Sequence, residues 1–105
     1  MPGARKFITH VFPEEYTGAV HAVIQAPART VYGVTVTLRW GPWVKKVRMW
    51  RVDAQGSALI FAKTDRDSVP LSVTSNKPLL LSAGAGYPDL PANRQHDHNT
   101  GWQRG

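Results

Sequence analysis

The sequence predicts a small all-β protein, an antiparallel β-sandwich, with a small β-barrel as the alternative. Three observations predict this class. Apolar and polar residues alternate at every second position in several segments, turn residues recur at short intervals, and no segment has the spacing of an amphipathic helix. Six or seven short strands in this arrangement are typical of sandwiches and barrels. The 105 residues are enough for one domain.

The clearest strand is expected at residues 31–40. One of its faces is apolar, formed by Tyr32, Val34, Val36, Leu38 and Trp40. Period-two alternation of this kind indicates a half-buried strand. Gly41-Pro42 predicts a turn, and residues 43–52 then form the returning strand of a hairpin. The alternation changes phase within residues 43–52, so we expect a bulge near Arg48 that redirects the side chains.

Four further strands are expected. Residues 16–25 are apolar at both phases, which favours a central strand. Shorter strands are predicted at 57–63, 69–74 and 79–82, separated by polar turns.

The two ends differ in composition from the middle. Residues 1–15 are interpreted either as an arm that adds a strand to a neighbour or as the first strand of the domain, and both remain open. Residues 16–83 form the predicted sandwich. Residues 84–105 are predicted to be an extended tail in which Tyr87, Leu90 and Trp102 are isolated anchors.

Composition restricts the chemistry and the partners. The chain has no cysteine, which excludes disulfides and thiolate metal sites. Its net charge of +6 favours a phosphate-bearing or acidic partner, although charge also serves solubility. There is neither a signal-peptide pattern nor an apolar run long enough to span a membrane. We therefore expect no membrane partner, no secretion by a signal peptide, and a location in the cytoplasm or within a larger assembly.

Basic and aromatic residues are concentrated between residues 39 and 51. Cations interleaved with aromatic rings are typical of surfaces that follow phosphates and stack bases. In the competing interpretation Trp40 and Trp50 belong to the core, and the cations form a solvated face that protects a sheet edge. A neutral sugar fits less well, because Asp, Asn and Gln are missing beside the rings. The candidate partner-binding residues are Arg39, Trp43, Lys45, Lys46, Arg48, Arg51, Tyr87 and Trp102.

No pattern in the chain predicts catalysis. Gly84 and Gly86 lack the third glycine and the following helix of a dinucleotide site. His96 and His98 point the same way on an extended segment, but zinc needs further ligands, and a solvated tail is the preferred interpretation. We therefore expect no enzymatic activity, no catalytic, cofactor or metal site, and no small-molecule substrate.

A family resemblance suggests a class of function. The stretch Val47 to Gly56, followed by Val69 to Val73, resembles the short immunoglobulin-like or jelly-roll-like sandwich modules of tailed-bacteriophage virion proteins. The resemblance implies a capsid decoration, head-completion or tail accessory role, and it transfers no functional residue. The first expectation is thus a structural or assembly protein that binds a repeating protein partner, as a homo-oligomer or lattice contact. The alternative is a nucleic-acid-binding module that uses the hairpin 39–51.

Overall fold

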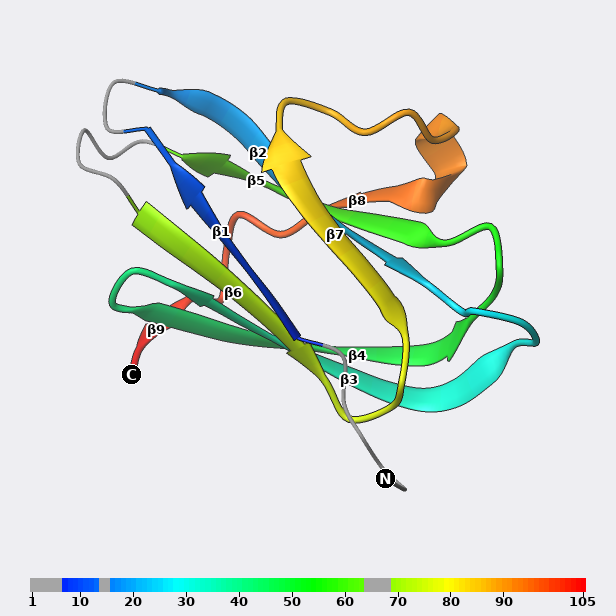
Figure 1. The fold of residues 1–105 in the computed structure, drawn as a ribbon. Coiled ribbons are helices and arrows are strands. Elements are labelled where there is room, and N and C mark those ends of the chain that lie inside the picture. The colour runs from blue at the N-terminus through cyan, green and yellow to red at the C-terminus, as the bar shows by residue number, and fades with distance from the viewer. Residues whose placement is uncertain (1–6, 14–15, 64–68) are drawn as a thin grey trace.

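The computed structural model describes residues 7–13, 16–63 and 69–105, and within these residues it confirms an all-β sandwich (Figure 1). The strands are β1 Phe7–Phe12, β2 Gly18–Gln25, β3 Val31–Trp40, β4 Trp43–Val52, β5 Ser57–Lys63, β6 Val69–Ser75, β7 Leu80–Ala85, β8 Gln95–Asp97 and β9 Gln103–Arg104. A short 3-10 helix, η1, covers Ala92–Arg94. One sheet has the order β1-β6-β3-β4-β9, and the other has the order β7-β2-β5-β8.

The core lies between the two sheets and follows the period-two pattern. On β3, Val34, Val36 and Leu38 are buried, and Trp40 is 8% exposed. The facing sheet contributes alternate residues of β2 and β5, among them Ile24 and Phe61. Burial of each large apolar side chain stabilises the fold by about 1.5–3 kcal/mol. The predicted apolar face is therefore confirmed from Val34 to Trp40.

The hairpin of β3 and β4 changes phase without a bulge. Val36 pairs with Val47, Val34 with Met49 and Tyr32 with Arg51, so no residue is inserted and the expected bulge near Arg48 is wrong. The change occurs at Gly33 instead, where φ is 66° and the ladder has no pair opposite Trp50. Glycine adopts this left-handed conformation without a Cβ clash.

The phase change alters which aromatic side chains are buried. Tyr32 is 54% exposed and Trp50 is 79% exposed, so neither belongs to the core, contrary to expectation. Val52, by contrast, is buried, because the strand has turned its opposite side inward beyond Trp50.

The amino-terminal segment belongs to the domain as far as it is described. β1 pairs antiparallel with β6, from Phe7 opposite Thr74 to Phe12 opposite Val69. Of the two interpretations, the first strand therefore applies to residues 7–12, whereas residues 1–6 and 14–15 lie outside the described residues.

The carboxy-terminal segment folds onto the sandwich, which differs from the predicted extended tail. β7 continues through Gly84 to Ala85. Because β7 and β8 lie at opposite edges of one sheet, the segment between them crosses the outer face of that sheet (Figure 1). Ala58 and Ile60, which point to that face, are buried. β8 then pairs in parallel with β5, and β9 pairs with the start of β4.

Candidate functional site

The outer face of the five-stranded sheet is polar and basic. Its central positions on β3, β4 and β6 are set by the pairs Thr35–Arg48, Thr37–Lys46, Thr37–Thr74 and Arg39–Ser72. Arg39, Lys46 and Arg48 are exposed there. We call this surface the basic face. The described residues of these three strands include no Asp or Glu, so the positive potential of this face has no local compensation.

One end of the basic face holds a cationic hollow of about 520 Å³ beside β9. Its charged lining consists of Arg39, Lys45, Lys46 and Arg104. Lys45 Nζ donates a hydrogen bond to the carbonyl oxygen of Thr100, at 2.5 Å, and partial burial lowers the pKa of Lys45. These four cations from β3, β4 and β9 line one opening, and clustered cations favour the binding of a phosphate group.

Trp43 and Arg104 form a pair at the margin of this hollow. The Arg104 guanidinium carbon lies 5.4 Å from the centroid of the half-buried Trp43 ring. A cation over an indole face is attracted by its quadrupole. Trp43 therefore positions a cation, and its ring also lines a hollow with Trp40 and Trp102.

The other end of the basic face carries two exposed aromatic rings. Tyr32 and Trp50 meet edge to face, with centroids 5.8 Å apart and an interplanar angle of 65°. Beside them is a hollow of about 380 Å³, which we call the Trp50 hollow. It is lined by Gly33, Val34, Thr35, Arg48, Met49 and Trp50. An indole and a guanidinium thus border the same opening.

The histidines of β8 line a groove between β4 and β8. His96 is exposed and His98 is half-buried. Burial first, and then the charges of Lys45 and His96, lower the pKa of His98 below its usual value. Within the described part of the chain, no three His, Asp or Glu side chains gather closely enough to hold a metal ion.

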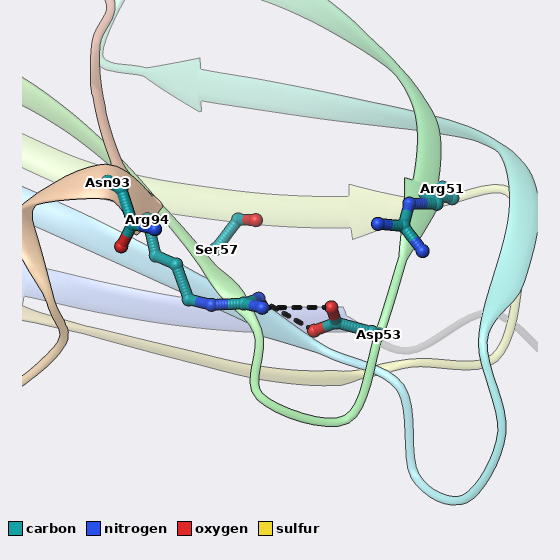
Figure 2. Close-up of a pocket in the computed structure, with 5 residues that line it drawn as sticks. All are labelled: Arg51, Asp53, Ser57, Asn93 and Arg94. Atoms are coloured by element: carbon teal, nitrogen blue, oxygen red, sulfur yellow. Dashed lines mark hydrogen bonds and ion pairs between the residues drawn. The ribbon is translucent and has the colours of Figure 1, made fainter.

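A further hollow, drawn in Figure 2, is structural. Arg94 bridges to Asp53 at 2.7 and 3.1 Å, and Asp53 also accepts hydrogen bonds from the backbone N–H groups of Gln55 and Gly56. The Arg94 hydrogen bond is the main reason why the pKa of Asp53 is lowered. This network ties η1 to the turn between β4 and β5 by pairing Arg94 with Asp53, while Arg51, Ser57 and Asn93 complete the lining of the hollow.

The sequence-predicted site residues are brought together only in part. Arg39, Lys46 and Arg48 lie on the basic face, Arg39, Lys45 and Lys46 line the hollow at its end, and the exposed Arg51 lies farther along β4. Tyr87 is 67% exposed on the segment that crosses the other sheet. Trp102 packs against Trp40 and Phe61, with centroid separations of 5.7 and 4.9 Å. Tyr87 therefore does not join the hairpin surface, whereas Trp102 lines a hollow of about 460 Å³ together with Trp40 and Trp43 of the hairpin.

Sequence reasoning missed four residues of this surface. Tyr32 is expected on the apolar face of its strand and Arg104 in the tail, and neither Trp50 nor Gly33 is among the candidate partner-binding residues. A glycine inside an otherwise regular strand was the available signal, since it often marks a close approach by another group.

No family model, no curated protein and no solved structure matches this chain. The resemblance to phage virion modules therefore remains a hypothesis from the sequence. The described residues contain no helix that is long and apolar enough to cross a membrane.

Proposed function

We propose that this chain is a non-enzymatic nucleic-acid-binding module that holds the phosphate backbone on its basic face. The observation that supports this most directly is the convergence of Arg39, Lys45, Lys46 and Arg104 on one hollow. Arg48 extends the same charge along β4. Phosphate contacts of this kind provide most of the affinity of sequence-independent binding.

The spacing of the side chains is compatible with a phosphate chain. Lys46 and Arg48 lie two residues apart on one face of β4, which corresponds to about 7 Å. That distance equals the axial rise of about two nucleotides in a stacked strand, at about 3.4 Å each. The hydroxyl groups of Thr35, Thr37 and Ser72 beside them are further donors of the type that contacts phosphate oxygens.

The test is the salt dependence of binding to fluorescein-labelled oligothymidylate of about 20 nucleotides, longer than common site sizes. Fluorescence anisotropy gives the binding constant between roughly 50 and 200 mM salt. Five contacting cations predict a slope of log K against log salt of about −3.5, from about 0.7 per phosphate contact. The double variant Lys46→Gln/Arg48→Gln is expected to reduce the slope by about 1.4.

The matched control is Arg29→Gln/Lys77→Gln, which removes the same charge from exposed residues outside the basic face. This control is expected to retain the wild-type slope. Salt-independent binding, or equal losses in the two double variants, would contradict the proposal.

A second candidate function is the assembly role that the sequence resemblance suggests, in which the chain decorates or completes a virion by binding a repeating protein partner. One specific observation favours it. β9 pairs only with Trp43 and Val44. Along the rest of β4, the edge that faces away from β3 is therefore not paired with any strand among the described residues. An open edge can accept a strand from a partner, although the cations along β4 also discourage such pairing.

Light scattering separates the two candidate functions. The mass is measured at low and high salt, with and without oligothymidylate. A multimer that forms without nucleic acid supports the assembly role. A monomer that gains mass only with the oligonucleotide, and only at low salt, supports nucleic-acid binding.

A further inference from the structure

Trp50 lies where its side chain buries little apolar area against the sandwich. The ring is 79% exposed on the outer face, beside the 54% exposed Tyr32. A tryptophan contributes to stability through the large apolar area that it buries, and this ring leaves most of that area in water. The exposed pair therefore stabilises the fold mainly through its own edge-to-face contact and buries little apolar area.

Gly33 adds a second feature that weakens the strand. It lies opposite Trp50 in the register, has a φ of 66°, and interrupts the pairing of β3 with β4. Glycine inside a strand lowers its stability and marks places where another group approaches the backbone. A Cβ built on Gly33 would meet no atom within 4 Å, so the space above its backbone is open.

These features meet in the Trp50 hollow. Its lining includes the indole of Trp50, the cation of Arg48 and the short side chain of Thr35, and it contains no carboxylate or carboxamide. Neutral sugars usually require such groups beside an aromatic ring, and the carboxylate that shares a hollow with Trp50, that of Asp97, lines the groove between β4 and β8 instead. An aromatic wall beside a cation and an open glycine backbone suits a flat π-system that is attached to an anion.

We propose that the Trp50 hollow takes an unpaired base of a single-stranded nucleic acid, which stacks on the indole while Arg48 contacts the adjoining phosphate. This inference rests on the proposed function and specifies its ligand as single-stranded. In a duplex the base faces are covered by their neighbours, so a protein ring reaches them only where a strand is unpaired or a base is flipped out.

The bound nucleic-acid strand continues from the Trp50 hollow toward the cationic hollow beside β9. Trp50 and Val44 are six positions apart on β4, which corresponds to about 20 Å. A stacked strand covers that distance in about six nucleotides, at about 3.4 Å each. This length lies within the range of roughly 4 to 16 nucleotides that small β-folds use for single strands.

The experiment compares oligothymidylate with an abasic oligomer of the same length, which has the phosphates but no bases. The wild type is expected to bind oligothymidylate about 5- to 150-fold more tightly than the abasic oligomer, the range given by one stacked base. Trp50→Ala is expected to remove this preference and to leave the salt slope unchanged. The affinity for a duplex of equal length is expected to be unchanged in Trp50→Ala, because a duplex offers no exposed base face to the ring.

Two further variants make the result specific. Gly33→Asn tolerates a positive φ and places a side chain in the hollow, so the preference for bases is expected to fall without unfolding. Tyr87→Ala removes another exposed aromatic ring, on the segment that crosses the other sheet, and is expected to retain the preference. Thermal unfolding of each variant verifies that the fold is intact.

The outcomes distinguish this inference from the proposed function. Salt-dependent binding with equal affinity for oligothymidylate and the abasic oligomer, or with an undiminished preference in Trp50→Ala, overturns the stacking site and leaves the basic face in place. Absence of binding to every oligomer overturns both.

Discussion

Replacement of Trp102 tests whether the carboxy-terminal segment is an integral part of the fold. Its ring contacts Trp40 edge to face and Phe61 in a tilted arrangement, and its Nε1–H donates to the carbonyl oxygen of His98 at 2.7 Å. Two aromatic pairs contribute about 0.5–1.5 kcal/mol each, and the hydrogen bond contributes about 1 kcal/mol. Trp102→Ala is therefore expected to reduce the free energy of unfolding by about 2 to 4 kcal/mol. At about 4–8 °C per kcal/mol, the melting temperature falls by roughly 10 to 30 °C.

Urea denaturation followed by far-UV circular dichroism measures this change. Trp102→Phe is a matched variant that keeps a ring between the sheets and loses only the hydrogen bond, so its loss is expected to be about 1 kcal/mol. Tyr87→Ala changes an exposed ring of the same segment and is expected to stay within about 0.5 kcal/mol of the wild type. A loss below about 1 kcal/mol in Trp102→Ala would refute the packing of this segment against the core.

Two further predictions concern the same segment. Arg94→Gln removes the bridge to Asp53 and is expected to accelerate amide hydrogen exchange in β8 but not in β3; equal exchange in both strands would contradict this role. Because the pKa of His98 is lowered in the folded chain, the unfolded chain binds a proton more readily. The free energy of unfolding therefore falls as pH drops below 6.5, and this group does not change it at pH values above 6.5. His98→Gln is expected to remove that part of the pH dependence in denaturation curves measured across this range, and an unchanged dependence would argue against it.

Asp53 gives a corresponding prediction for unfolding at acidic pH. The pKa of its carboxyl is held below the usual 3.8, chiefly by the Arg94 hydrogen bond, so the stabilisation is present above 3.8 and is lost as pH falls through the lowered value. Acid unfolding curves of Asp53→Asn are expected to lack this component. A curve that matches the wild type would show that the carboxylate makes no contribution.

The middle of the fold was predictable because its physical signal is local. Alternation from Val34 to Trp40, followed by Gly41-Pro42, is sufficient to define a hairpin with one buried face. Gly41, at φ 58°, precedes a proline, and a glycine in this first position is what a type II′ turn uses. The phase change at Gly33 was not predictable, because alternation alone cannot distinguish a rotated strand from an inserted residue.

The carboxy-terminal segment was mispredicted for a different reason. β8 has three residues and β9 has two, which is too short for any period to be visible. Their positions depend on long-range contacts, such as Trp102 against Phe61 and the Asn99 Oδ1 that accepts from the Ala62 N–H. The basic residues of the candidate site were identified from their density in the sequence, whereas Arg104 joins them only through the pairing of β9 with β4.

An NMR titration of the isotopically labelled chain with oligothymidylate tests the central claim most directly. The basic face predicts that amide resonances of Thr37, Arg39, Lys46 and Arg48 shift together with the indole N–H of Trp50, while the indole N–H of the buried Trp40 remains in place. Shifts that cluster on β2, β5 and β7, or spectra that do not change on addition of the oligonucleotide, would contradict the claim.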